Sequence, residues 1–393
     1  MRKLSALLGL LLPLQLAYAW EVSGYVEPEL RLFAEEGLQA GQERTDVSLA
    51  IQPEFIHEQG NHQFVFTPFA RIDQQDDQRT HADVRELYWL YAGDDWELQA
   101  GIGRVFWGVT ESQHLVDIIN QTDLVEDIDT EDKLGQPMIR LSLVRDWGIV
   151  DAFVLPGFRE RTYPGKKGRL RYPLVVDTDA ARYESSREQR HVDWALRWTQ
   201  TWGDWDIGLA HFSGTSRDPQ LSPGVGGGGK MVLIPYYPLI DQTSLDLQAV
   251  KGDWLWKLEA ISRNGQWKKR YSAVTAGFEY TLVGVNGSAV DVGLVAEYLW
   301  DERGRDALTP FQADVMAGVR IALNDEQSTE ALLGLITDLE YDSNSFSIEA
   351  SRRLYDSFKL NLEARFFDSG DPRDLAYAFR RDDYVQMSLA WYF

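Results

Sequence analysis

Hydrophobic and polar residues alternate along most of this chain, in blocks of about ten residues. The clearest block is 358–366, in which every even position is apolar and every odd position is polar or charged. Blocks 192–198 and 254–260 repeat the pattern. Because successive side chains of a β-strand point to opposite faces, each block predicts a strand with one apolar and one polar face. The pattern therefore predicts an all-β protein.

Eighteen such strands can be placed along the chain. Their predicted ranges are 21–33, 45–58, 62–73, 81–92, 96–107, 137–144, 147–155, 190–201, 205–213, 241–250, 254–264, 271–282, 289–301, 311–323, 330–339, 345–354, 358–367 and 383–393. An even number of strands of about 9–11 residues is typical of transmembrane barrels. We therefore expect a transmembrane antiparallel up-and-down β-barrel of roughly 16–18 strands.

The connections between these strands alternate between short and long. Tight turns follow the even-numbered strands, as at 59–61 and 202–204, whereas the long segments 108–136, 156–189 and 214–240 follow odd-numbered strands. A soluble β-sandwich, the alternative for this pattern, has no reason to sort its loops by end. Short periplasmic turns and long external loops are typical of outer-membrane barrels.

Tryptophans gather at the predicted turns and at the chain end. They are Trp96, Trp147, Trp202, Trp205, Trp254, Trp256 and Trp391. Such a ring at one rim is what an aromatic girdle at a membrane interface requires.

Both ends of the chain carry export signals. A basic n-region and an apolar core lead to a small-x-small cleavage site, so 1–19 is predicted to be a signal peptide and 20–393 a single mature barrel. The last block alternates up to Phe393, which resembles the C-terminal signal that the outer-membrane assembly machinery recognises. That machinery is therefore an expected partner.

Composition narrows the function further. The chain has 61 acidic and 39 basic residues, a net charge of −22, and no cysteine. Nucleic acid, which is anionic, is therefore not an expected partner. Without disulfides, stability must come from burial and backbone pairing. After the signal peptide no apolar run reaches the ~18 residues that a transmembrane helix needs.

Charged residues of both signs occupy the polar positions of the predicted strands. We assign a pore wall to Glu29, Arg31, Arg197, Lys257, Glu259, Arg353, Lys359, Glu363 and Arg365. A barrel of this size is too wide for its wall side chains to fill, so water enters. Such a wall would orient polar solutes, or its ion pairs would hold an inert lumen.

The segment 108–136 is the least barrel-like part. Leu115, Ile118 and Ile119 have helix-like spacing, so folding into the barrel mouth would give them something to pack on. Its acidic residues would then narrow the channel and favour cations. We assign a pore constriction to Asp117, Asp123, Glu126, Asp127, Asp129 and Glu131. The alternative is a solvated acidic external loop.

The acidic residues of this segment also have part of a metal-site spacing. Asp127, Asp129 and Glu131 match the first ligand positions of a calcium loop. However, the sixth position is Asp132 rather than glycine and the twelfth is Met138 rather than glutamate, so this is no EF-hand. We expect no metal and no cofactor.

A basic run lies within 156–189. It comprises Arg159, Arg161, Lys166, Lys167, Arg169 and Arg171. The run could bind lipopolysaccharide phosphates at the outer leaflet or draw anions toward the mouth. The favoured alternative is a solvated loop that is balanced by acidic neighbours.

One motif has an enzymatic interpretation. His211 and Ser213 lie two residues apart on a predicted strand, on its lipid-facing side. Outer-membrane phospholipases and lipid A deacylases use a His-x-Ser-Asn arrangement in which His activates Ser. Here the residue after Ser213 is Gly214, and the chain is far longer than those small barrels require.

The chain resembles a family of uncharacterised proteobacterial outer-membrane proteins with a porin-like domain of unknown function. The similar stretches are 103–108, 116–124, 322–325 and 349–354. This chain continues the Trp-Gly stretch with Val109-Thr110-Glu111, where family members commonly have small or charged residues. The resemblance implies an outer-membrane barrel and no particular substrate.

These observations predict a porin-like channel for passive diffusion of small polar solutes, in the cell outer membrane of a Gram-negative bacterium. Two alternatives stay open. One is a lipid-modifying enzyme that uses His211 and Ser213, and the other is a non-conducting barrel that exports a polymer or anchors a partner.

Overall fold

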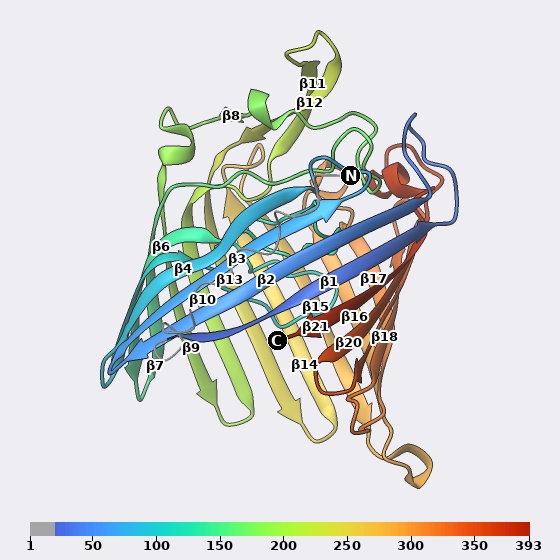
Figure 1. Cartoon of the computed structure of the whole chain (residues 1–393). Helices are drawn as coiled ribbons and strands as arrows, with labels where there is room; N and C mark the ends of the chain where they lie inside the picture. Colours follow the sequence, from blue (N-terminus) through green and yellow to red (C-terminus); the bar gives the residue numbers. More distant parts are fainter. Residues whose placement is uncertain (1–19) are drawn as a thin grey trace, which may run out of the picture.

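Eighteen strands form one closed antiparallel sheet in the computed structural model, which describes residues 20–393 (Figure 1). The barrel strands are β1 (Glu21–Phe33), β2 (Thr45–Gln59), β3 (His62–Asp73), β4 (His81–Ala92), β5 (Trp96–Gly103), β6 (Gln136–Arg145), β7 (Gly148–Pro156), β9 (Val192–Trp202), β10 (Trp205–Thr215), β13 (Leu239–Lys251), β14 (Trp254–Asn264), β15 (Tyr271–Leu282), β16 (Asp291–Asp301), β17 (Ala313–Ala322), β18 (Glu330–Asp338), β19 (Asn344–Leu354), β20 (Phe358–Asp368) and β21 (Tyr384–Tyr392). Each strand pairs with the next along the barrel, and β21 pairs with β1. The predicted signal peptide, 1–19, lies outside the described residues.

Closure of the barrel uses the last residue of the chain. The backbone N–H of Gly24 donates to the carbonyl oxygen of Phe393 at 3.2 Å, and the N–H of Phe393 donates back at 3.1 Å. In hydrocarbon each unpaired backbone group costs several kcal/mol, so a sheet in a membrane must close on itself.

The predicted eighteen-stranded barrel is confirmed, and nearly all strand ends fall within two residues of their predicted positions. The exception is β5, which was predicted to reach residue 107 but ends at Gly103. There the Asn120 side chain accepts from the N–H of Val105 at 2.9 Å and donates to the carbonyl of Gly103 at 2.9 Å. These bonds take the backbone groups that strand pairing would use, and the chain leaves the wall.

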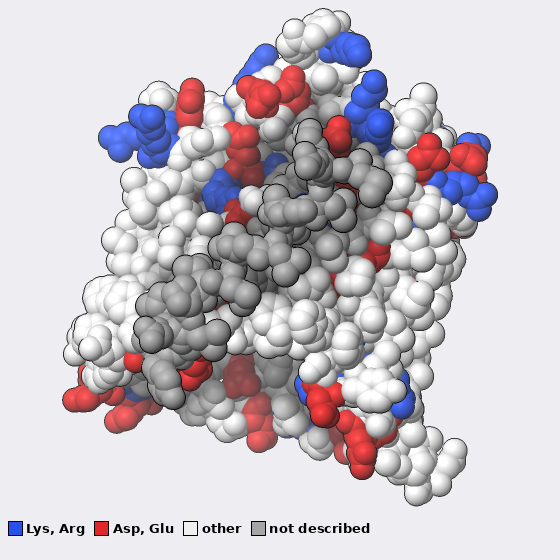
Figure 2. Space-filling model, in the orientation of Figure 1, with Lys and Arg blue, Asp and Glu red and all other residues white. Residues whose placement is uncertain are grey.

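The outer surface of the barrel is apolar along its flanks. Leu49, Ile51, Leu209, Leu294 and Leu362 are all exposed on it. Figure 2 shows charged residues gathered toward the two ends of the molecule, with uncharged flanks between them. An apolar band between two polar ends matches the hydrocarbon layer of a bilayer.

The two ends of the barrel differ. At the turn end, six of the connections have two or three residues, and the glycines of the turns at Gly203 and Gly252 have φ values of +61° and +63°. A left-handed φ favours glycine because a Cβ would clash. The connections 283–290 and 323–329 are longer, so the expectation that every turn at this end is tight is wrong. Exposed tryptophans surround this end: Trp147, Trp202, Trp205, Trp254, Trp256 and Trp391.

The opposite, loop end carries a small additional sheet. A hairpin of β11 (Gln220–Val225) and β12 (Met231–Tyr237) projects from it, and β12 also pairs with β8 (Arg182–Tyr183) (Figure 1). This hairpin lies within 214–240, which was predicted to be a loop because prolines and glycines interrupt the alternation of apolar and polar residues there.

Short 3-10 helices complete the described structure. They are η2 (Thr178–Ala180), η3 (Glu188–Arg190), η4 (Val285–Gly287), η5 (Gly304–Asp306) and η6 (Leu375–Phe379). Within residues 20–393, no helix is long and apolar enough to cross a bilayer.

Candidate functional site

The segment 104–135 between β5 and β6 lies inside the barrel. Its apolar residues Val116, Ile118 and Ile119 are buried in one cluster with residues from the inner faces of the strands. The inner-face members include Phe153, Ala195, Phe212, Ile240 and Ile261. The segment therefore covers the inner wall from β7 to β15.

Glu259 on β14 holds the first part of this segment. Its carboxylate accepts hydrogen bonds from the backbone N–H groups of Val109 (2.7 Å), Thr110 (3.1 Å) and Val116 (3.1 Å). The hydroxyl of Thr110 donates to it as well, at 2.8 Å. Glu259 was assigned to the pore wall, but its side chain is fully buried by the segment that it binds. Its role in this structure is to position that segment.

Glu297 on β16 is a second anchor, which the sequence analysis missed. It accepts from the backbone N–H groups of Glu111 (2.7 Å) and Ser112 (2.9 Å). The side chain of Glu111 in turn pairs with Arg320 at 2.7 Å and with Lys257 at 3.5 Å. Glu297 occupies a polar position of its strand, so the alternation places it in the lumen but does not give its partner.

The far part of the segment is tied to the opposite wall by buried ion pairs. Glu126 lies 2.8 Å from Arg71 and 2.7 Å from His81, and Asp123 lies 2.7 Å from Arg85. Burial acts to raise the pKa of Glu126, but the hydrogen bond with His81 and the nearby arginines lower it to about 2. Glu126 is therefore charged at neutral pH and binds the segment to β3 and β4.

Arg79 joins this part of the segment to two wall strands. It lies 2.8 Å from Glu29 on β1 and 3.0 Å from Asp73 on β3, and it donates to the carbonyl of Val125 at 2.9 Å. We call this buried set the locked network. Its members are Glu29, Arg31, Arg71, Asp73, Arg79, His81, Arg85, Asp123, Glu126 and Asp127. Glu29 and Arg31 were assigned to the pore wall, and the structure buries both of them in this network, which matches the alternative of a wall of ion pairs.

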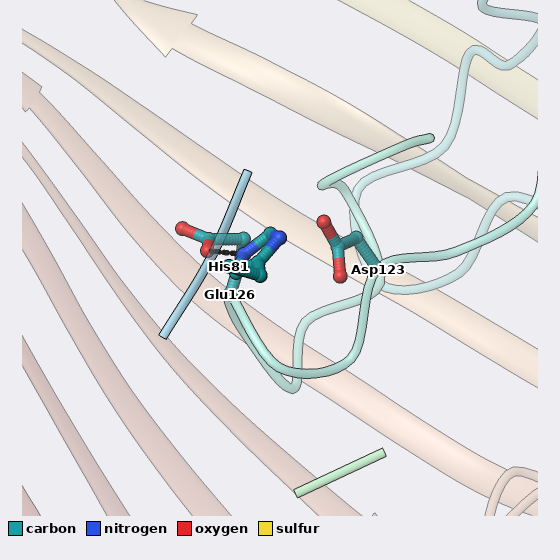
Figure 3. A group of neighbouring side chains, drawn as sticks. All are labelled: His81, Asp123 and Glu126. Carbon is teal, nitrogen blue, oxygen red and sulfur yellow. Dashed lines mark hydrogen bonds and ion pairs between the residues drawn. The ribbon is translucent and has the colours of Figure 1, made fainter. Parts of the chain in front are cut away.

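Three members of the locked network are placed as if to hold a metal ion. Possible ligand atoms of His81, Asp123 and Glu126 lie within 4.8 Å of one another, and Figure 3 shows His81 bound to Glu126, with Asp123 beside them. However, the guanidinium groups of Arg71 and Arg85 already neutralise the two carboxylates. A cation would have to displace them, so this arrangement fits an ion-pair network rather than a metal site.

The acidic spacing at 127–131 has a local explanation. The Asp127 side chain accepts from the N–H of Asp129 at 3.1 Å, and the Asp129 side chain accepts from the N–H of Glu131 at 2.9 Å. These are Asx turns, in which a side chain bonds the backbone two residues ahead. The calcium-like spacing of these acidic residues is therefore explained by the two turns that bend the segment.

Only part of the assigned constriction faces open space. Asp117, Asp129 and Glu131 line a lumen cavity of about 390 Å³. Asp123, Glu126 and Asp127 do not line it, because the locked network buries them. The assignment missed this division because sequence spacing does not reveal which carboxylates meet arginines.

The three carboxylates that line the cavity differ in their surroundings. Asp117 is buried and pairs with Lys133 at 3.1 Å, and burial raises its pKa. Asp129 lies 3.3 Å from Arg365. The side chain of Glu131 is 68% exposed and lies 3.9 Å from His114, and the interaction with His114 lowers the pKa of Glu131. Glu131 is therefore the most accessible of these three carboxylates.

The remaining pore-wall assignments fall into two groups. Arg197 pairs with Asp246 at 2.8 Å, and Arg365 pairs with Glu363 at 2.7 Å, on the inner faces of their strands. Arg353 and Lys359 form a cross-strand pair near the turn end. Within residues 20–393, no carboxylate lies within ion-pair distance of either Arg353 or Lys359.

The basic run crosses the loop end instead of extending into solvent. Arg169 is buried and lies 2.6 Å from Asp382, and it also donates to the carbonyl oxygens of Glu35 and Glu43. Arg159 pairs with Asp83 and Arg161 with Asp218, each at 2.8 Å. Lys166 and Lys167 are exposed. Arg159, Arg161 and Arg169 are balanced by acidic residues, as the favoured expectation had it, but Arg169 and Arg171 are buried, so the loop is not solvated throughout.

The enzymatic motif does not form the contact that nucleophile activation needs. The Nδ1 of His211 lies 3.0 Å from the Thr243 hydroxyl, and its ring packs beside Trp194. Within the described residues, His211 has no hydrogen bond to Ser213.

Comparisons with known proteins give likeness of fold only. No family model and no curated protein matches the chain, so the resemblance to the porin-like family stays a prediction. Among solved structures, the chain is similar to OmpT, an outer membrane protein of Vibrio cholerae in trimer form, at 9% identity and a TM-score of 0.48, covering 95% of this chain and 99% of that one. A mutant of the Rh. blastica porin matches at 10% identity and a TM-score of 0.45, covering 95% and 100%. These likenesses are too distant to say what this chain does.

Proposed function

We propose that this protein is a porin-like channel of the outer membrane that admits small polar solutes by passive diffusion. The observation that carries the proposal is the cavity beside the folded-in segment, which is lined by accessible charged side chains. Glu131 and Glu349 face it with 68% and 48% of their side chains exposed. Isolated charges inside a protein are costly unless water or a partner solvates them, so this space suits water and ions.

The exposed charge of the cavity favours cations. Arg365 is only 15% exposed, and it lies 3.1 Å from Glu349 and 2.7 Å from Glu363 in addition to its contact with Asp129. One guanidinium therefore faces three carboxylates. The proposed channel conducts cations in preference to anions, more strongly at low salt because screening then acts over a longer range.

Ion conductance tests this proposal. The purified barrel is inserted into a planar bilayer, and single-channel current is recorded in potassium chloride. We expect steady unitary currents. A Ser347→Trp variant places a ring on the inner face of β19 and should lower the unitary conductance, whereas Ile348→Trp, on the outer face, should leave it unchanged. Absence of current from folded, inserted protein contradicts the channel and favours an anchoring or export role.

A further inference from the structure

Segment 104–135 covers one large group of apolar residues on the inner wall and leaves another group uncovered. The covered group lies on β7 to β15. The second group lies on β17 and β18, where Met316, Leu332 and Ile336 border the cavity. Met316 is only 4% exposed because it packs with Val295, Leu299 and Phe311, whereas Leu332 and Ile336 are half-buried. In β18 the alternation breaks down, since 331–336 is apolar on both faces except for Gly334. The polar-inside pattern of the barrel is therefore absent along this part of the lumen.

The strand register orders these residues into a strip. Facing pairs on the inner wall run from Asp314 and Asp338, through Met316 and Ile336, then Gly318 and Gly334, to Arg320 and Leu332. Because glycine has no side chain, nothing projects from the inner wall at the pair of Gly318 and Gly334. A Cβ on Gly318 would lie 2.9 Å from the Met316 Cε, and one on Gly334 would lie 3.0 Å from the Ser347 Oγ. We call Met316, Gly318, Leu332, Gly334 and Ile336 the apolar strip.

The strip lies in a space large enough for a small organic molecule. The cavity of about 390 Å³ falls within the range of ligand pockets, roughly 300–1,000 Å³. Leu308 and Phe311, from the connection before β17, border the same cavity. Apolar surface that faces water is unfavourable in proportion to its area, and a solute with an apolar body would cover it.

Accessible negative charge flanks the strip. Leu332 pairs across strands with Glu349, and Glu131 borders the same cavity from the folded-in segment. At the other end of the strip, Asp314 and Asp338 face each other across strands but are only 2% and 4% exposed, so the accessible negative charge lies at the Glu131 and Glu349 end.

The arginine beside Leu332 does not reverse this balance. Arg320 is held between Glu111 at 2.7 Å and Glu279 at 3.4 Å. Two carboxylates thus face its single positive charge.

We infer that the apolar strip and its carboxylates form a solute subsite for small organic cations, meaning an ammonium group attached to an alkyl or aromatic body. The body lies along the strip, and the ammonium group lies between Glu131 and Glu349. This inference rests on the proposed channel and names the class of solute that the channel retains during passage.

Two probes of equal charge test the inference. Benzyltrimethylammonium and tetramethylammonium are added separately to open channels in potassium chloride, and the concentration that halves the potassium current is measured for each. We expect the aromatic probe to block at a concentration about tenfold lower, which is the effect of burying part of a ring. Equal blocking concentrations in a conducting channel overturn the subsite and leave the channel standing.

Variants locate the effect. Leu332→Ser with Ile336→Ser should remove most of the difference between the probes. The matched control, Leu333→Val with Leu335→Val on the outer face of the same strand, should keep the difference. Benzoate serves as the third probe. Stronger block by benzoate than by benzyltrimethylammonium assigns the strip to organic anions instead and overturns the charge part of the inference.

Discussion

Charged residues of the same types are buried on one side of the lumen and exposed on the other. On the side of β1 to β4, Arg71, Arg79 and Arg85 meet carboxylates of the wall strands and of the folded-in segment in a buried network. On the side of β17 to β20, Glu131 and Glu349 stay largely exposed beside an apolar strip. The difference teaches that a carboxylate in this lumen is structural or solute-facing according to how deeply its partners bury it.

This contrast predicts that arginines of the two sides contribute very differently to the free energy of unfolding. Removing one partner of a buried ion pair leaves an unpaired charge, whereas an exposed pair contributes little. Arg79→Met should therefore lower the free energy of unfolding by about 3–5 kcal/mol. Arg320→Met, on the open side, should lower it by about 1 kcal/mol or less. Urea unfolding followed by tryptophan fluorescence measures both, and equal losses would falsify the division of the lumen.

Neutralising Glu259, which anchors segment 104–135, should have the next largest effect on the stability of that segment. Glu259→Gln replaces one acceptor oxygen by an NH2 group and removes the charge that three backbone N–H groups and one hydroxyl face. Hydrogen bonds to charged groups contribute roughly 1.5–3 kcal/mol. Hydrogen exchange at Val109, Thr110 and Val116 should speed up accordingly. In the control, Glu349→Gln, those amides should keep their protection, because Glu349 bonds none of them.

The sequence predicts the strands well because a membrane barrel requires period two in every strand, and each block carries that signal by itself. It also places Arg197, Glu363 and Arg365 on the inner face, since parity alone decides this. The ion-pair partners of these side chains cannot be predicted in the same way. Glu126 meets Arg71 across 55 positions of the chain, and no spacing rule connects them. Buried anchors and open charges therefore have the same sequence pattern, which is why Glu259 was mistaken for a pore-wall residue.

Ion selectivity should depend only on the exposed carboxylates of the β17 to β20 side, which is the open side of the lumen. Neutralising Glu131 and Glu349 together, as glutamines, should reduce the cation preference and change stability by no more than about 0.5 kcal/mol. Asp123→Asn with Glu126→Gln should instead destabilise the barrel and leave the selectivity of the remaining folded channels nearly intact. Reversal potentials under a salt gradient compare the two pairs. A larger shift from the second pair would place the selective charges in the locked network and reverse the comparison.

The smallest expected effect concerns the contact between the two parts of the segment, His114 with Glu131. Burial acts to lower the pKa of His114, but the nearby carboxylates of Glu131 and Glu259, at 3.9 and 3.7 Å, outweigh it and raise the pKa to about 9. Because the folded pKa lies above the unfolded value of about 6.5, this contact stabilises the segment fully below pH 6.5 and is lost as the pH rises through 9.

Hydrogen exchange of segment 104–135, corrected for the intrinsic rate at each pH, should therefore show falling protection between pH 6.5 and 9. The backbone bonds to Glu297 do not involve His114, so the loss should stay confined to residues near His114, Glu131 and Glu259. His114→Gln keeps a hydrogen-bonding side chain but cannot titrate, and its protection should not change across that range. If the variant and the native chain lose protection alike, another group is responsible, and the open side of the lumen carries no pH-dependent contact at His114.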